Sequence, residues 1–425
     1  MGAADVLDPY AGNLLTAQLG PILSREETLT RLAFMPSPPE NLSDVPRHIR
    51  RHMLMEIRDL HLPSLAGARV AETTDLLIRQ SYRYRDPARA ATWTTVANEP
   101  YCTAPRQPAM AAVVVGYSGV GKTDAIKRAL NMYPAQVITH AKFPKLVGPH
   151  HQIVWLSADV PASGRASDLA ANLMRAFDEA MASYLPEQPS RFATLLSRDR
   201  RNGPQMLDEW RQVVAMHFLG VLHIDEVQNF FKLPTLEQRR KLKGDGLIEL
   251  RLIEDQALKS ILTFTNTAQI PLLLSGTPDG VGALSKRLSN VQRFVSSGYH
   301  KMEPFWNASD KAFEFFVDQL ARYQFVGKRL VVGGELRALV FQLTAGIPRL
   351  MVALWIAAHL VAFERQIDDL RIDDFKRAAR THLAPVAPAV AALLSRDPLQ
   401  MRRYEDLMPS DDGFWESLWS RNISA

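Results

Sequence analysis

The sequence is poor in cysteine and has no long apolar run. Cys102 is the only cysteine among 425 residues, so no disulfide can form within the chain, and a reducing, cytoplasmic compartment is expected. The N-terminal residues carry no export or lipid signal. The longest apolar run near the C-terminus, "MVALWIAAHLVAF" from Met351, contains His359 and is shorter than the ~18 residues that cross a bilayer. We expect a buried helix there and no membrane association.

The sequence also lacks internal repeats, low-complexity tracts and a strong excess of one charge. There are 50 Lys and Arg residues against 45 Asp and Glu residues, which leaves a net charge of +5. This excess suits an anionic partner, but it is smaller than that of tails that bind nucleic acid by charge alone. The length and ordinary composition predict a globular chain of two or three domains.

Apolar periodicity predicts an α/β domain between helical extensions. Short β-branched runs alternate with amphipathic helices, which is typical of a parallel sheet. We expect five parallel strands from the runs "AAVVVG", "QVITH", "HQIVWLSAD", "FLGVLHID" and "IPLLLSGT", and no strand after Gly298. The predicted divisions are a helical arm with proline-rich breaks and an interaction role (1–108), a nucleotide-binding α/β domain (109–298), a helical lid (299–384) and a partner-binding tail (385–425).

The run "VVVGYSGVGKTDAIKRAL" follows the pattern G-x-x-x-x-G-K-[ST] between an apolar strand and a helix. Such a loop closes main-chain N–H groups on phosphates, while its lysine reaches the β- and γ-phosphates and its hydroxyl binds Mg²⁺. The alternative is a chance glycine turn. The predicted ATP-binding residues are Gly116, Ser118, Gly119, Val120, Gly121, Lys122, Thr123 and Asp124, with Thr123 also a Mg²⁺ ligand.

The run "FLGVLHIDEVQNF" places two acids at the end of a predicted strand. Asp225 could hold the water shell of Mg²⁺, and Glu226 could orient and deprotonate an attacking water. The alternative is a strand-end pair that caps the next helix. The interval between Lys122 and Asp225 exceeds what a bare strand-helix-strand-helix-strand unit needs, so we expect extra helices within it.

Three further positions are candidates for sensing the γ-phosphate. Thr277, or Ser275 if the register slips, follows the strand "IPLLLSGT", although a turn at Gly-Thr-Pro explains the same letters. Arg293, with Arg287 as the second choice, could reach the γ-phosphate of a neighbouring subunit, or could be a solvated arginine. Arg349 in "AGIPRLMVAL" lies in the first turn of a predicted helix, where the helix dipole disfavours a positive charge. This position predicts an anionic partner for Arg349, and a surface ion pair is the alternative.

Taken together, these motifs resemble AAA+ ATPases of the initiator-like branch. Finer strings resemble the TnsC family, the ATP-dependent regulators of cut-and-paste DNA transposition related to TniB and IstB. The resemblance covers roughly residues 82–383, with similar strings on both sides. The strings that carry it are "QVITH", "HQIVWLSADVPASG", "LGVLHIDEVQNF", "IPLLLSGTP" and "MEPFWNASDKAFEFFVDQLARYQF".

The resemblance implies a bacterial, DNA-associated switch that uses ATP and Mg²⁺. Members of this family form ATP-bound rings or helical filaments of many copies on double-stranded DNA. They connect a target selector of the TniQ or TnsD kind to a TnsB-like transposase, with a TnsA-like subunit as a further option, and hydrolysis limits or dismantles the assembly. By the same resemblance Lys122 and Thr123 bind phosphate and Mg²⁺, Asp225 and Glu226 handle metal and water, and Arg349 is the lid sensor.

Lys142 and Lys145 in "THAKFPKLVGPHH" are candidate DNA contacts, because related ATPases project a loop from this place into the centre of a ring. A solvated basic loop is the alternative, and "EQRRKLKGDG", with Arg239, Arg240, Lys241 and Lys243, competes for the same role. Other functions also stay open: a helicase loader or DNA-remodelling ATPase on the same fold, a small-molecule phosphotransferase, and a signalling ATPase that scaffolds proteins without DNA.

Overall fold

A computed structural model describes residues 8–96, 110–197, 202–231, 261, 269–278, 295–397 and 400–401. The chain divides into two compact units, and both are assembled from separate stretches of sequence. The first contains Met1–Thr28, Leu65–Val115 and Thr123–Lys301, and the second contains Leu29–Ser64, Gly116–Lys122 and Met302–Ala425. The residues expected to form one N-terminal arm are therefore shared between the two units.

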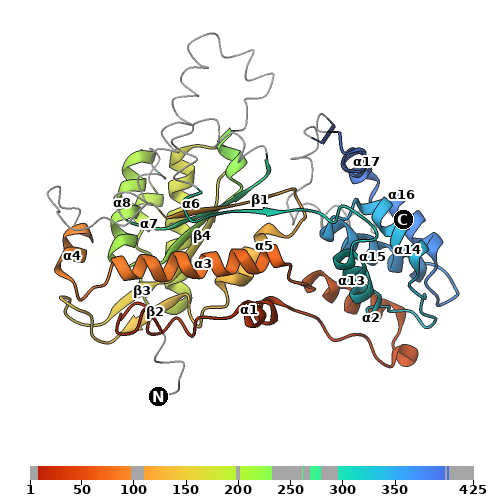
Figure 1. Cartoon of the computed structure of the whole chain (residues 1–425), viewed down its shortest axis with the longest axis horizontal. Coiled ribbons are helices and arrows are strands. Elements are labelled where there is room, and N and C mark those ends of the chain that lie inside the picture. Colours follow the sequence, from red (N-terminus) through yellow and green to blue (C-terminus); the bar gives the residue numbers. More distant parts are fainter. Residues whose placement is uncertain are drawn as a thin grey trace, which may run out of the picture. The chain divides into compact units, whose positions relative to one another are not determined.

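The first unit is built on a five-stranded sheet with the order β4-β5-β6-β1-β7. Figure 1 labels β1 and β4 of this sheet. The pairs β4–β5, β5–β6 and β6–β1 are parallel, so the carboxyl ends of these four strands lie at one edge of the sheet. The strands are β1 (Ala111–Gly116), β4 (Trp155–Asp159), β5 (Val221–Asp225), β6 (Leu272–Gly276) and β7 (Gly298–Met302). Every residue of β1, β5 and β6 is buried, as expected for central strands.

The sheet has the expected number of strands, but one of them differs from the prediction. The run "QVITH" forms β2 (Val137–His140), which pairs antiparallel with β3 (His150–Ile153) in a separate two-stranded sheet. The run "HQIVWLSAD" is divided between β3 and β4. The fifth strand is β7, so the expectation that strands end at Gly298 is wrong. Its sequence, GYHKM, exposes Tyr299 and Lys301 and has no apolar run, because β7 is an edge strand.

Helices surround the sheet and fill the long interval before Asp225. The described residues of that interval form the β2–β3 hairpin, β4 and, besides α5, the helices α6, α7 and α8, as the spacing predicts. Helices α6 and α8 pack on each other, and the indole Nε1 of Trp210 donates to the Leu173 carbonyl at 3.0 Å. The helices of this unit include α3 (Leu65–Tyr84), α4 (Ala90–Val96), α5 (Lys122–Leu130), α6 (Ala166–Tyr184), α7 (Ala193–Leu196) and α8 (Gly203–Met216), while α1 (Arg25–Leu32) crosses the division of the chain.

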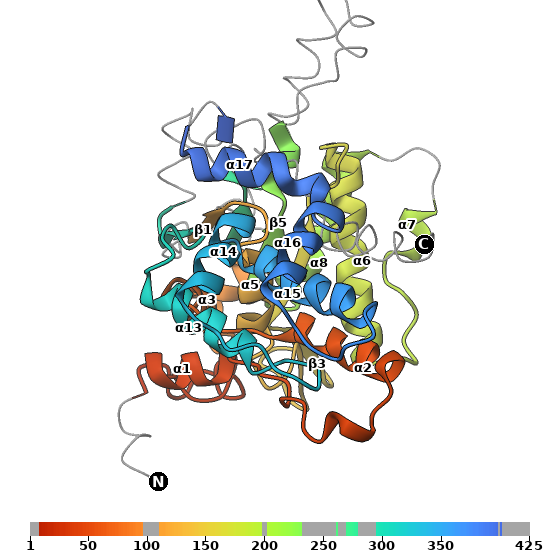
Figure 2. The ribbon, with the colours of Figure 1, turned by 90° about the vertical axis from the view of Figure 1, so that its right-hand side faces the viewer.

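The second unit is helical, and Figure 2 shows its helices with their labels. Helix α15 is its centre: the predicted buried run is buried along nearly its whole length, and α13, α14 and α16 pack on it. Trp355 Nε1 donates to the Tyr323 carbonyl at 2.8 Å inside this core. The described helices are α2 (Arg47–Leu54), α13 (Lys311–Ala321), α14 (Gly334–Thr344), α15 (Pro348–Phe363), α16 (Ile372–Thr381) and α17 (Ala387–Ser395), with short 3-10 turns η2 (Leu42–Asp44), η3 (Met55–Asp59) and η5 (Ala384–Val386).

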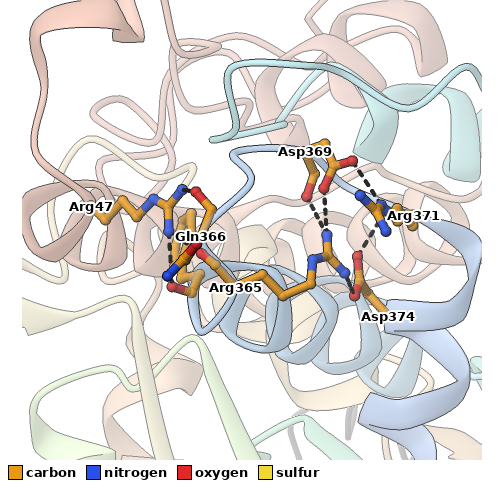
Figure 3. Close-up of polar contacts among 7 residues, drawn as sticks. Arg47, Arg365, Gln366, Asp369, Arg371 and Asp374 are labelled. Carbon is orange, nitrogen blue, oxygen red and sulfur yellow. Dashed lines mark hydrogen bonds and ion pairs between the residues drawn. The ribbon is translucent and has the colours of Figure 1, made fainter.

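Residues 29–64 are held on this helical unit by two arginines of α2. Figure 3 shows Arg47 donating to main-chain carbonyls just beyond α15, while Arg365 joins the acids of the following turn and α16. The carbonyls are those of Phe363, Arg365 and Gln366, and the acids are Asp369 and Asp374. Arg50 is 5% exposed and pairs with Asp368 at 2.7 Å. The N-terminal segment is thus part of the core structure of this unit.

None of the described helices is by itself long and apolar enough to cross a membrane; one bent pair, Gly334–Thr344 with Pro348–Phe363, passes that test by length and composition.

Candidate nucleotide site

Three glycines shape the loop after β1. A Cβ on Gly116 would lie 2.3 Å from the main-chain oxygen of Met302, so no side chain fits at this position. Gly119 and Gly121 have φ angles of 84° and 92°, in the left-handed region that glycine adopts without strain. One close approach and two left-handed positions therefore explain the glycine pattern of the motif.

The cationic end of the loop is Lys122, where α5 begins. Its Nζ donates to the carbonyls of Gly116 at 2.7 Å and Tyr117 at 3.1 Å, so the ammonium lies over the main chain of the loop. The first N–H groups of a helix have no partner within the helix and give its start a positive potential. Together these donors fit an anion such as a polyphosphate.

The other predicted loop residues contribute differently. Ser118 is half-buried and Val120 is buried, so Val120 helps to pack the loop. The carboxylate of Asp124 accepts from Arg128 one turn later, at 3.1 Å. The side chain of Asp124 therefore pairs with a residue of its own helix, and its main-chain N–H is one of the groups at the start of α5.

The structure brings Thr123 and Asp225 together. Thr123 Oγ1 donates to Asp225 Oδ2 at 2.5 Å, and the other carboxylate oxygen accepts from Ser275 Oγ at 2.5 Å and from the main-chain N–H of Glu226 at 2.8 Å. Burial opposes ionisation of Asp225, but the nearby His223 and these three hydrogen bonds together hold its pKa below the usual range. Asp225 is therefore a buried, ionised carboxylate beside a hydroxyl.

A buried hydrogen-bond chain continues from Asp225 into the sheet. Since Ser275 gives its only proton to Asp225, its oxygen must accept from Nε2–H of His223 at 2.8 Å. The Nδ1 of His223 then accepts from Ser157 Oγ at 2.8 Å. Desolvation lowers the pKa of His223, which favours the neutral ring that this pattern of donors and acceptors needs. The sequence signal for this hydrogen-bond chain is the histidine within the otherwise apolar run "VLHID". It was not among the predicted site residues.

Asp159 is a second acid at the same edge. It is the register partner of Asp225 on β4, and its side chain is exposed. Partial desolvation, and then the negative charge of Asp225, raise the pKa of Asp159. Asp159 ends a strand without a neighbouring motif, so no local pattern in the sequence marks it.

Glu226 and Thr277 are linked through a residue that the sequence analysis quoted but did not assign. Glu226 is exposed and has a φ of 57°. Gln228 Nε2 donates to Glu226 Oε2, and Gln228 Oε1 accepts from the main-chain N–H of Thr277 at 3.1 Å. Thr277 is 3% exposed, and within the described structure its Oγ1 is buried without a hydrogen-bond partner. Ser275, the second choice for a sensor, is instead occupied by Asp225 and His223.

In the helical unit, Arg349 lies in the first turn of α15 against the loop. Its main-chain N–H donates to the Gly119 carbonyl at 3.2 Å. A Cβ on Gly119 would lie 3.2 Å from Arg349 Cβ and 3.6 Å from Arg349 Nε. The side chain of Arg349 thus passes beside the loop, and Gly119 leaves room for it.

The side chains of Thr123 and Asp225 suit a Mg²⁺ ion that is also bound by the phosphates of a nucleotide. A hydroxyl and a carboxylate at 2.5 Å are the hard oxygen donors that Mg²⁺ prefers, and Mg²⁺ usually takes one or two carboxylates together with phosphates and waters. Within the described ranges, no group of three or more His, Cys, Asp or Glu side chains could hold a metal on its own. The residues therefore fit a metal that arrives with a nucleotide.

The remaining predicted residues lie apart from these groups. Lys142 and Lys145 are exposed on the hairpin between β2 and β3, where Lys145 has a φ of 61°. Several candidates fall outside the described residues, namely Arg287, Arg293, Arg239, Arg240, Lys241 and Lys243, as do Cys102 and most of the C-terminal tail.

Residues 106–284 match the model of a protein family described as an AAA domain. The chain contains an AAA domain. The match includes the loop after β1, Asp225, Glu226 and Thr277, whereas Arg293 and Arg349 lie beyond it. No curated protein sequence matches the chain.

Solved structures with distant similarity include a Walker-type ATPase of Pyrococcus abyssi, at 14% identity and a TM-score of 0.37 over 73% of this chain and 84% of that one. The ORC2 protein of Aeropyrum pernix in ADPNP-ADP complexes has 13% identity and a TM-score of 0.38 over 82% and 84% of the two chains. Drosophila ORC bound to DNA has 11% identity and a TM-score of 0.36 over 94% and 86%.

Proposed function

We propose that this chain is an ATP-dependent regulator of DNA transposition, similar to the TnsC family, that assembles on double-stranded target DNA. In this proposal ATP holds copies together, and hydrolysis limits or dismantles the assembly. The observation that carries the ATPase part is the Thr123–Asp225 pair at 2.5 Å with Glu226 next in sequence. The transposition part rests on the family strings in the sequence.

In the proposed hydrolysis, the residues around the loop and the end of β5 have separate roles. Lys122 and the start of α5 would bind the phosphates, and Thr123 and Asp225 would hold Mg²⁺, which would neutralise charge on the phosphates. Since Thr123 now donates its proton to Asp225, its oxygen lone pairs stay available as a ligand. Glu226 takes a proton from water as general base.

Two residues are proposed to report the γ-phosphate. Thr277 has a buried hydroxyl with no partner within the described structure, and an unsatisfied buried hydroxyl is costly unless some ligand uses it. Arg349 is proposed as the lid sensor, since its side chain passes beside Gly119 of the loop. Arg293, with Arg287 as second choice, is proposed to act on the nucleotide of a neighbouring copy.

The proposed DNA contacts are Lys142 and Lys145. Both are exposed on a short hairpin separate from the main sheet, so they can contact a surface without disturbing the core. They would bind phosphates and read no bases. The proposed protein partners are a TniQ- or TnsD-like target selector and a TnsB-like transposase, with or without a TnsA-like subunit.

The variant Glu226→Gln tests this function. A general base contributes about 10²–10⁴-fold to rate, so hydrolysis should fall at least 100-fold on this scale while ATP binding is unchanged. Complexes with duplex DNA should then last longer than those of the parent chain. Glu187→Gln is the matched control, because Glu187 is exposed in the turn after α6 and is not one of the site residues, so this variant should behave like the parent. Retained hydrolysis, lost ATP binding, or no longer-lived assembly would contradict the proposal.

A further inference from the structure

The geometry points to Gln228 as a positioning residue that fixes the general base Glu226 and ties its placement to the end of β6. This inference rests on the proposed function of Glu226. Gln228 lies in the 3-10 turn η4 (Val227–Phe231), is 8% exposed, and touches both Glu226 and Thr277 through its one amide group.

The orientation of this amide is fixed by chemistry. A carboxylate can only accept and a main-chain N–H can only donate. The NH₂ of Gln228 must therefore face Glu226, and its carbonyl must face Thr277, as the structure shows. A flipped amide would place two acceptors together at Glu226 and two donors together at Thr277. Gln228 therefore fits only one way.

The position of Gln228 is also fixed by packing. Gly276 precedes Thr277 on β6, and a Cβ there would lie 2.6 Å from Val227 Cγ2 and 2.8 Å from Gln228 Oε1. Strand β6 is buried and has a neighbouring strand on each side, so it holds the amide of Gln228 in a fixed position. The glycine at position 276 is what allows Gln228 to lie against it.

Glu226, in contrast, needs such support. Its side chain is exposed, so without a partner it would sample several rotamers. The bond from Gln228 to Oε2 holds the carboxylate of Glu226 in one orientation. Thr277 carries the proposed phosphate-sensing hydroxyl and also the N–H that holds Gln228. Sensor and base are therefore joined by a single buried amide.

Two variants separate the contacts. Gln228→Glu keeps an acceptor for Thr277 and has nearly the same shape, but it replaces the donor to Glu226 by a carboxylate. Gln228→Met has similar volume and removes both hydrogen bonds without adding charge, so it decides the outcome if the charged variant folds poorly. The assay is steady-state ATP hydrolysis with duplex DNA present. In both variants kcat should fall about 10–100-fold, as it does when a residue that orients a functional group is replaced. The ATP affinity should stay within about twofold of the parent, because a residue that acts only on the reaction step does not change substrate binding.

The double variant with Glu226→Gln distinguishes positioning from a general structural role. If Gln228 acts through Glu226, adding Gln228→Met to Glu226→Gln should not lower hydrolysis further, because the base is already gone. A further loss in the double variant, parental or raised kcat in both single variants, or an effect on ATP affinity alone would overturn the inference. If Glu226→Gln itself hydrolyses ATP normally, the proposed function fails; if only the Gln228 variants do, the inference alone fails.

Discussion

Replacing Arg50 by methionine should release residues 29–64 from the helical unit. The Arg50 guanidinium donates to Asp368 and to the carbonyls of Leu42, Val45 and Phe325, and its side chain is 6% exposed. Breaking a buried ion pair costs about 3–5 kcal/mol. Asp368 keeps 30% exposure, so it can rehydrate in part and the low end applies. We expect a loss of about 3 kcal/mol in local stability.

Hydrogen exchange measures this loss directly. At about 1.4 kcal/mol for each factor of ten, the amides of α2 should exchange roughly 100-fold faster in Arg50→Met than in the parent. Arg51→Met is the matched control, because Arg51 is the next residue of the same helix and is half-exposed; its amides should exchange within about threefold of the parent, as expected for a surface change below 0.5 kcal/mol. Equal exchange in the two variants would refute the view that Arg50 anchors this segment.

Three further outcomes are expected. Replacing Lys142 and Lys145 by alanine should weaken duplex binding regardless of sequence and lower the slope of log affinity against log salt by about 1 per lysine; an unchanged slope would remove both from the interface. Thr277→Val should slow hydrolysis without lowering the unfolding midpoint, since the hydroxyl makes no hydrogen bond within the described structure; normal hydrolysis would argue against a sensor. His359 is fully buried, and desolvation lowers its pKa to about 4 from 6.5, so its stabilising effect is complete above pH 6.5 and falls toward pH 4 as the unfolded chain takes up the proton. His359→Phe should make the urea midpoint less sensitive to acid in that range, and an unchanged pH profile would contradict this.

The features that the sequence predicted well have a local signal. The loop at Gly116–Thr123 is a contiguous motif, and α15 is a long apolar run whose burial follows from composition alone. Asp225 ends one buried strand and Thr277 directly follows another, so the parallel topology fixes which edge of the sheet they share.

Other features depend on contacts between distant parts of the chain. Strand β7 is half-exposed and lacks an apolar pattern. The sequence of β2 predicts a strand of the main sheet, but β2 pairs with β3 in a separate two-stranded sheet. Gln228 is one polar letter in a turn, and its role is visible only when Thr277, 49 positions away, is placed beside it. The docking of residues 29–64 requires partners about 300 positions later, such as Asp368 for Arg50, which no local pattern indicates.

In the proposed function, ATP bound at the loop and held through Thr123 and Asp225 assembles copies of this chain around duplex DNA. Electron microscopy of the purified chain with duplex DNA and a non-hydrolysable ATP analogue would show this assembly. We predict rings or helical filaments on the duplex that disappear when the analogue is replaced by ADP. Single copies under saturating analogue and DNA would contradict it.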